Sequence, residues 1–395
     1  MNDESAKSTM NAEGSEKTTE GKSAKAAAWH PRLATPEDNR ALIDLTAACT
    51  MEGDIGLRVD RSPDFFALNR IEGKDFRLAV ADAPGGGLAG CMAGAERLAY
   101  LSGAEARVMY VSDLKVHPDQ RGSGAADALS GFIRGYCRER GGDHVPTVMT
   151  VLGGNALMAR RAQGPRGMPE LTRFATLRAH NVSLLWKRSP PAAAGASIRR
   201  ATRADCEEMA DLWRRVAPGR QFAAVFTAES LAAWVDQAPG LDWEDYLLAR
   251  DGRGCLLGFV AFWDQDSFKQ TRVVRYSRNL KLVRMGFNLA APFLRAAPLP
   301  PPGGALRYLT AVNLCVAEGR ADVLRALVIE AYNASRGRGY AFLSVGLDKK
   351  DPLSAAFQGL MAQPTDIDAL VTTPAGRYRG PALDVLPLHF ETALV

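Results

Sequence analysis

The sequence lacks the patterns that mark several common classes of protein. Its six cysteines are scattered, and no Cys-x-x-Cys pair or nearby pair of histidines offers the ligand spacing of a zinc site. No apolar run reaches the ~18 residues of a membrane-spanning helix, and the first residues contain no apolar signal core. We therefore expect reduced thiols, no metal, no transmembrane segment and a cytoplasmic location.

The sequence also has little excess of charge. The formal net charge is +5 at pH 7 over 395 residues, and 47% of the residues are hydrophobic, which is typical of a globular protein. So small an excess does not indicate a nucleic-acid partner, although it favours a small anionic ligand. The length is comfortable for two domains.

One stretch combines an apolar run, a glycine turn and a helical pattern. The β-branched run at 107–116 predicts a strand that Pro118 ends, and apolar spacings of three and four predict a helix at 125–140. Backbone N–H groups at a helix start are unpaired and lie at the positive end of its dipole, so they suit phosphate oxygens. Gly122 and Gly124 carry no Cβ, which would let a pyrophosphate approach closely.

Two phosphate motifs are excluded for this turn. A P-loop needs Lys after its last glycine, and the dinucleotide fingerprint needs glycine where Asp127 stands. The pattern that remains resembles the acyl-CoA-binding motif of the GNAT superfamily of N-acyltransferases, [Gln/Arg]-x-x-Gly-x-[Gly/Ala]. The matching residues are Arg121-Gly122-Ser123-Gly124-Ala125-Ala126, after the strand end Leu114-Lys115-Val116-His117-Pro118.

The resemblance implies where a cofactor binds. In GNAT proteins the backbone of this strand contacts the pantetheine arm and the thioester, and the turn holds the pyrophosphate. Asn155 is similar to the family's Asn that bonds the pantetheine arm; the alternative is that it caps its own helix. The implied cofactor-binding residues are Leu114, Val116, Arg121, Gly122, Ser123, Gly124, Ala125, Ala126 and Asn155.

The elements expected around this turn follow the GNAT order over about 31–188. Thr35-Pro36-Glu37-Asp38 supplies an N-cap, a proline and an acidic first turn, so it predicts a helix start. The further expected elements are a helix at 62–72, strands at 76–80, 88–100 and 145–152, a short helix at 155–162 and a terminal hairpin at 171–187.

Composition divides the chain into segments. Residues 1–28 have almost no large apolar side chains and predict a disordered tail, and 189–196 is a Pro/Ala-rich linker. The fold class that we expect is α+β, with two tandem GNAT-like domains at 29–188 and 197–395. Each would be a mixed, mostly antiparallel twisted sheet flanked by helices.

The second domain is predicted from a repeat of landmarks. Thr202-Arg203-Ala204-Asp205 parallels the first helix start, and Leu314-Cys315-Val316 parallels Leu114-Lys115-Val116. After Val316, however, one glycine remains, between Glu318 and Asp322, and carboxylates there would repel a pyrophosphate. We therefore expect this copy to be degenerate and silent toward CoA.

An insertion at about 264–304 interrupts the second copy. It carries cations every third residue, and that spacing winds around a helix and does not form one face. Two interpretations stay open: a solvated basic helix, or a lid that contacts an anionic or acyl substrate or a membrane surface. The cations are Arg272, Arg275, Arg278, Lys281 and Arg284.

Catalytic candidates lie on the strand before the turn. Strict alternation would place Tyr110 and Ser112 on one face with Leu114 and Val116, and Asp113 on the other. Tyr110 and Ser112 match strand positions where bases occur in the family. Asp113 is the only carboxylate in that part of the strand, and the alternative is that it is a structural acid with its partners satisfied. The family's proton-donating Tyr has no counterpart near Ala162.

The function implied is N-acyl transfer. The donor would be acetyl-CoA or another acyl-CoA, and a primary amine of a small molecule or peptide would attack the thioester directly in the N-terminal domain. Two alternatives remain: a non-catalytic acyl-CoA-binding or scaffold protein, and a transferase of this fold that uses acyl carrier protein or aminoacyl-tRNA. The sequence leaves open whether the chain forms a homodimer.

Overall fold

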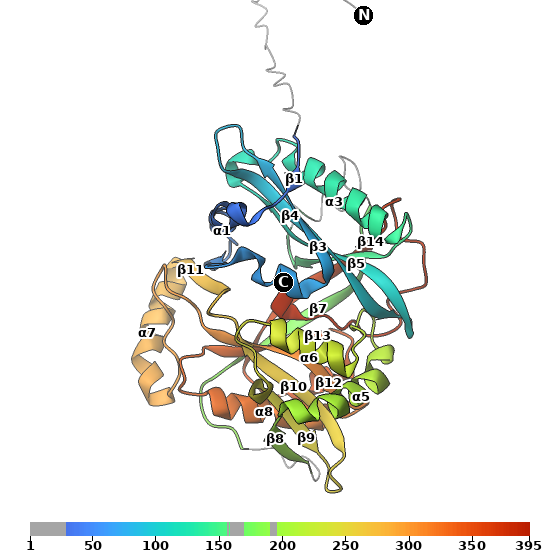
Figure 1. Cartoon of the computed structure of the whole chain (residues 1–395). Coiled ribbons are helices and arrows are strands. Elements are labelled where there is room, and N and C mark those ends of the chain that lie inside the picture. The colour runs from blue at the N-terminus through green and yellow to red at the C-terminus, as the bar shows by residue number, and fades with distance from the viewer. Residues whose placement is uncertain (1–28, 156–157, 159–169, 190–195) are drawn as a thin grey trace, which may run out of the picture.

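The computed structural model describes residues 29–155, 158, 170–189 and 196–395 (Figure 1). The predicted tail, most of the predicted short helix and most of the linker lie outside these residues. We call 29–189 the N-terminal half and 196–395 the C-terminal half. No described helix is long and apolar enough to cross a membrane. All six cysteines are described, and all are free thiols.

The N-terminal half begins at the predicted helix start. Thr35 and Asp38 form a capping box, in which a carboxylate oxygen of Asp38 accepts from the Thr35 N–H at 2.8 Å. The helices are α1 (Asn39–Ala48), α2 (Asn69–Glu72) and α3 (Ala125–Gly141). The strands are β1 (Arg32–Leu33), β2 (Ile55–Asp60), β3 (Lys74–Asp82), β4 (Leu88–Leu101), β5 (Ala104–Val116), β6 (Thr147–Leu152) and β7 (Thr172–Ser183).

The C-terminal half also begins its first helical segment with a capping box, formed by Thr202 and Asp205. Its helices are α5 (Cys206–Val216), α6 (Ala228–Gln237), α7 (Arg278–Leu294) and α8 (Ala321–Ser335). Its strands are β8 (Ser197–Arg200), β9 (Tyr246–Arg250), β10 (Leu256–Asp264), β11 (Gln270–Tyr276), β12 (Tyr308–Val316), β13 (Phe342–Asp348) and β14 (Ala362–Thr372).

One sheet of 12 strands runs through both halves, in the order β1-β3-β4-β5-β6-β14-β7-β13-β12-β10-β9-β8. β14 lies between β6 and β7, antiparallel to both, and β7 also pairs with β13. The hairpin predicted at 171–187 is therefore wrong. That segment is the single strand β7, and its neighbours in the sheet come from the far end of the chain.

Helices cover both faces of the sheet. In β3 and β4, Val80 and Ala93 pack with α1, whereas the adjacent residues Ala79 and Met92 pack with α3. This alternation follows from the two-residue period of a strand. In the C-terminal half, α5 and α6 share one apolar cluster with the sheet, and α8 shares the other.

The predicted insertion joins the two halves. Its first part, β11, pairs antiparallel with β2 of the N-terminal half in a separate two-stranded ribbon. Two ion pairs reinforce the ribbon: Arg272 Nε lies 2.9 Å from Asp60, and Arg275 contacts Glu52. Two of the predicted cations thus pair with acids of the N-terminal half.

The two halves share a further irregularity. Asp113 in β5 has φ 53° and Asn313 in β12 has φ 49°, each at a register shift against the neighbouring strand. Asp and Asn tolerate this left-handed conformation better than most residues. The same bulge at matching places supports a duplication, and the division into two domains stays a prediction.

The contacts of β7 and β14 generate a stability prediction. Leu177 is 0% exposed and packs with Ile367 of β14. We expect Leu177→Ala to lower the free energy of unfolding by about 2–5 kcal/mol, through lost burial and a residual cavity. Leu98→Ala, at a side chain that is 51% exposed, should change it by less than about 0.5 kcal/mol. Urea unfolding of both variants measures the difference; equal midpoints would contradict the packing.

Candidate functional site

The predicted glycine turn lies between β5 and α3. Gly122 and Gly124 have φ of 83° and 94°, which glycine adopts without strain, and a Cβ on Gly122 would meet nothing within 4 Å. Trp29 Nε1 donates to the Ser123 carbonyl at 2.9 Å and holds the turn. Arg121 is exposed and pairs with no carboxylate in the described part of the chain. This turn therefore offers open backbone at a helix start, and a cation whose described partner is the Cys49 thiol and no carboxylate.

Strands β5 and β6 separate just before the turn. β5 and β6 pair in parallel at three positions, Met109 to Val111 against Thr147 to Met149. β5 continues to Val116 and β6 to Leu152 without further pairing to each other. From Ser112 onward β5 therefore pairs with β4 outside the bulge and has no partner in β6. The Asp113 and Val116 carbonyls accept from the thiols of Cys91 and Cys49, at 3.3 Å and 3.5 Å, and the other groups on the β6 side can bond a ligand.

The bulge at Asp113 changes which side chains meet. Strict alternation places Ser112 and Asp113 on opposite faces, and this expectation is wrong. Ser112 Oγ donates to Glu72 Oε2 at 2.7 Å, and Asn69 Nδ2 donates to both Glu72 (3.2 Å) and Asp113 (3.0 Å). The left-handed residue resets the alternation, so both side chains turn toward the end of α2.

Glu72 is at the centre of a buried charge cluster. Glu72 is 3% exposed, and the negative charge of Asp113 lies close to it. Burial and this repulsion both disfavour the ionised carboxylate. Together they raise the pKa of Glu72 to about 7, although Arg97 and the Ser112 hydroxyl oppose the shift. A carboxyl with this pKa exchanges its proton near neutral pH, as a general base must.

Asp113 has the opposite electrostatic balance. Burial alone would raise its pKa, but Lys115 and Arg61 hold the pKa of Asp113 well below its usual range. Arg61 Nη1 lies 3.5 Å from Asp113, and Lys115 Nζ donates to the same carboxylate oxygen. Asp113 is therefore ionised at neutral pH and is a weak base.

Tyr110, one of the predicted bases, is buried. Its hydroxyl lies 3.0 Å from Thr150 Oγ1, and the Arg97 guanidinium lies 4.3 Å from the centre of its ring. Burial, with a contribution from Glu72, raises the pKa of Tyr110 above its usual value, so the phenol stays protonated. The three predicted catalytic residues thus lie around Glu72, and Glu72 has the pKa of a base.

Several residues of the C-terminal half reach this cluster. The Phe390 ring lies 4.9 Å from the ring of Tyr110 and 5.3 Å from the Arg97 guanidinium. Lys269, between β10 and β11, donates its Nζ to the Ala393 carbonyl at 2.9 Å. Burial first, and then the repulsion of Arg61, lower the pKa of Lys269 to about 7. Three buried atoms nearby, Arg61 Nε, Arg97 Nη2 and Asn69 Oδ1, have no hydrogen-bond partner among the described residues.

The sequence analysis missed Glu72 and Lys269. Glu72 ends the predicted 62–72 helix, outside any motif, and nothing local separates it from a surface acid. The predicted contact of Asn155 with a cofactor stays a prediction. Its side-chain oxygen accepts from the Met158 N–H at 3.1 Å, as a helix cap does.

The matching turn of the C-terminal half is closed. β12 and β13 also pair at three positions and then part. However, Leu314 and Val316 are 6% and 2% exposed, whereas Leu114 and Val116 are half-buried. The 3₁₀ segment Pro352–Phe357 packs in the same apolar cluster, and Arg320 pairs with Asp322 at 2.8 Å. This turn offers neither open strand nor free arginine.

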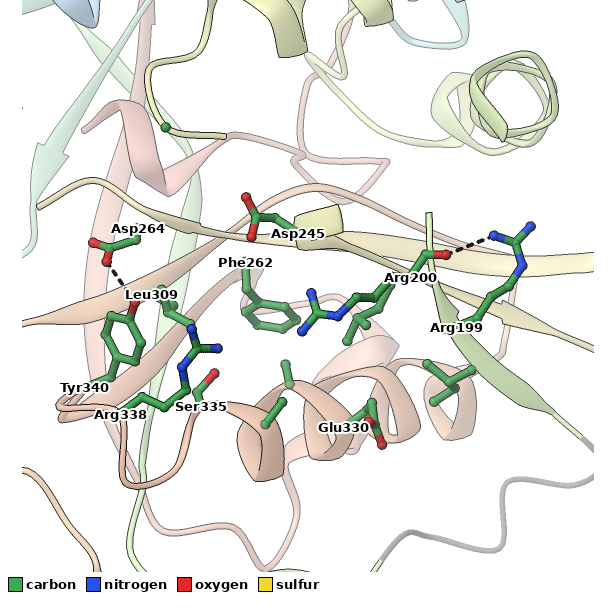
Figure 2. Close-up of a pocket in the computed structure, with 15 residues that line it drawn as sticks. Arg199, Arg200, Asp245, Phe262, Asp264, Leu309, Glu330, Ser335, Arg338 and Tyr340 are labelled. Carbon is green, nitrogen blue, oxygen red and sulfur yellow. Dashed lines mark hydrogen bonds between the residues drawn. The ribbon is translucent and has the colours of Figure 1, made fainter. Parts of the chain in front are cut away.

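A cavity of about 290 Å³ lies elsewhere in the C-terminal half, between α8 and the strands β8 to β10 (Figure 2). Its lining includes Leu309 near the start of β12, the end opposite the closed turn. Two hydrogen bonds join residues of its lining: Tyr340 Oη donates to Asp264 at 2.8 Å, and Arg199 to the Arg200 carbonyl at 2.9 Å. The cavity does not belong to the glycine-turn site.

Comparisons with known proteins place the fold. The chain superimposes on a GCN5-related N-acetyltransferase from Sphaerobacter thermophilus with a TM-score of 0.54 and 16% identity, over 88% of this chain and 96% of that one. It superimposes on Saccharomyces cerevisiae N-myristoyltransferase with bound myristoyl-CoA with a TM-score of 0.60 and 9% identity, over 90% and 84%. No family model and no curated protein sequence matches the chain. The predicted GNAT-type fold is confirmed.

The raised pKa of Glu72 has a consequence for stability. The folded protein keeps this proton to about pH 7, whereas the ordinary pKa is 4.5. The folded state therefore binds more protons between these values, and the free energy of unfolding falls as pH rises from 4.5 to 7. We expect Glu72→Gln to remove on the order of 2–3 kcal/mol of that fall.

Urea unfolding at a series of pH values measures this effect. Glu318→Gln is the matched control, because Glu318 is an exposed acid, and it should leave the pH dependence as in the wild type. A Glu72→Gln profile parallel to the wild type would show that Glu72 ionises normally.

Proposed function

We propose that the chain is an acyl-CoA-dependent N-acyltransferase with one active site, in its N-terminal half. The observation that carries the proposal is the parting of β5 and β6 directly before the open glycine turn. A pantetheine arm carries amides that can pair with the free edge of β5 as a strand does. The pyrophosphate would then reach Arg121 and the first N–H groups of α3.

The reaction that this site supports is direct transfer. A primary amine attacks the thioester carbonyl carbon, and a C–N bond forms while the carbonyl oxygen takes the negative charge. The amine loses one proton, the C–S bond breaks, and the CoA thiolate leaves and is protonated from solvent. Free N–H groups on the β6 side of β5 could stabilise the developing oxyanion. The donor proposed is acetyl-CoA, and the acceptor a small-molecule or peptide amine.

Glu72 is the proposed general base. Its pKa near 7 leaves a substantial ionised fraction at neutral pH, and Ser112 Oγ, 2.7 Å away, connects it to β5. The unpartnered Arg61 Nε and Arg97 Nη2 offer donors for a polar group of the acceptor. A base of this kind favours catalysis over the alternative of a non-catalytic acyl-CoA-binding protein.

Substitution at Gly122 tests the cofactor site. Gly122→Glu would place a carboxylate at the proposed pyrophosphate position, and we expect acetyl-CoA binding by calorimetry to weaken at least about tenfold. Gly319→Glu is the matched control. Gly319 also has positive φ (74°) and open space around a Cβ, but it lies at the closed turn, so binding should be unchanged. Equal weakening in both variants would count against a single site.

Substitution at Glu72 tests the base. With acetyl-CoA and a panel of primary amines, Glu72→Gln should lower kcat about 10²–10³-fold with little change in acetyl-CoA affinity. Wild-type kcat/KM should rise with pH through about 7, because the ionised carboxylate is the active form, and the variant should lose this rise. Glu105→Gln, at an exposed acid of β5, should keep both. An unchanged rate and pH profile in Glu72→Gln would exclude Glu72 as the base.

A further inference from the structure

α7 presents an apolar face to solvent. The helix lies at the outer edge of the molecule, beside β11 (Figure 1). Leu282, Met285, Leu289 and Phe293 are 68%, 62%, 73% and 90% exposed. Their spacings of three, four and four residues place them on one side of the helix. A surface helix normally turns such a face toward the core, so this stripe lacks a partner among the described residues.

The opposite side of α7 is bonded to the chain segment that follows the helix. Ala291 is 1% exposed. Asn288 exchanges two hydrogen bonds with the Leu299 backbone, at 3.0 Å and 2.8 Å, and Arg284 Nε donates to the same carbonyl at 3.0 Å. Because these contacts fix the rotation of the helix, the apolar stripe faces outward as a structural feature.

The charges around the stripe have one sign. No Asp or Glu occurs from residue 267 to residue 317. Arg272, Arg275 and Arg307 of this stretch are neutralised by acids outside it. Arg278, Lys281 and Arg295 are exposed and form no ion pair within the described part of the chain. The stripe is therefore flanked by free cations and by no anion of its own segment.

We infer that α7 docks the protein on an anionic lipid bilayer. The helix lies in the plane of the interface, with Leu282, Met285, Leu289 and Phe293 at the boundary between headgroups and acyl chains. Arg278, Lys281 and Arg295 contact the lipid phosphates. The inference is independent of the acyl-transfer proposal, because none of these residues belongs to the glycine turn or to the Glu72 cluster.

A second copy of the chain fits this surface less well. Two stripes packed together would bring two sets of free cations close, and 267–317 contains no carboxylate to pair with them. An anionic bilayer supplies both an apolar layer and the missing negative charge. Self-association is therefore treated as an outcome that would overturn the inference.

Co-sedimentation of the full chain with vesicles tests the inference. The wild type should bind vesicles of equal parts phosphatidylcholine and phosphatidylglycerol, should bind pure phosphatidylcholine at least about tenfold more weakly, and should lose binding to the anionic vesicles in molar salt. No binding to the anionic vesicles would overturn the inference, and so would equal binding to both kinds.

Paired variants separate the two contributions. Leu289→Ser with Phe293→Ser should reduce binding about tenfold or more, whereas Leu98→Ser with Val385→Ser, at exposed apolar residues elsewhere, should not. Arg278→Glu with Lys281→Glu should reduce it similarly, and Lys187→Glu with Arg253→Glu, at exposed cations outside the segment, should reduce it less.

Two results with these variants would contradict the inference that α7 binds a bilayer. Stripe variants that bind vesicles like the wild type would show that another surface binds lipid. If sedimentation velocity shows a wild-type dimer that Leu289→Ser with Phe293→Ser dissociates, the stripe is covered by a second copy and the inference is wrong.

Discussion

Strand β14 joins the two halves of the sheet. This strand comes from the end of the chain, yet it pairs with β6 on one side and β7 on the other. Without it, both strands would expose an edge of unpaired backbone groups. Because β7 also pairs with β13, the sheet continues from one half to the other. The geometry of β5 and β6 in the N-terminal half therefore depends on residues of the C-terminal half.

The buried charges of the site divide into an anchor and a titratable group. Asn69 bonds both Glu72 and Asp113, so the two carboxyls are close neighbours, and one of the pair must hold its charge at the expense of the other. Lys115 and Arg61 form ion pairs with Asp113 and keep its carboxylate ionised. Glu72 consequently takes the raised pKa. The bulge at Asp113 produces this arrangement, because it turns Ser112 toward Glu72 and Asp113 toward Asn69, and both of these residues belong to α2.

The two halves differ in what their matching strands do. Both keep a capping box, a left-handed residue in the long strand and a parallel pair that parts after three positions. In the N-terminal half the strand end stays accessible, whereas in the C-terminal half apolar side chains and the segment Pro352–Phe357 fill the space. The C-terminal half instead contributes β11, Lys269 and the exposed face of α7. In the C-terminal half, a closed strand end thus accompanies contacts to the other half.

Short-range patterns in the sequence were enough to predict many of the local elements and the glycine turn. The capping residues Thr35 and Thr202, the apolar strand at 107–116 and the helix from Ala125 follow from short-range patterns, and the resemblance in the turn predicted the fold. Other features appear only in the tertiary structure. The hairpin expected at 171–187 is a single strand, because its partner β14 lies far away in the chain.

Glu72 and Lys269 acquire shifted pKa values from charges and burial supplied by other segments. Alternation failed at Asp113, because one left-handed residue reverses the faces of every residue that follows. The outward apolar face of α7 depends on how the helix is bonded to the Leu299 backbone. Local propensity acts between near neighbours in the chain, whereas strand pairing, burial and electrostatics depend on distance in space, and only the folded chain sets those distances.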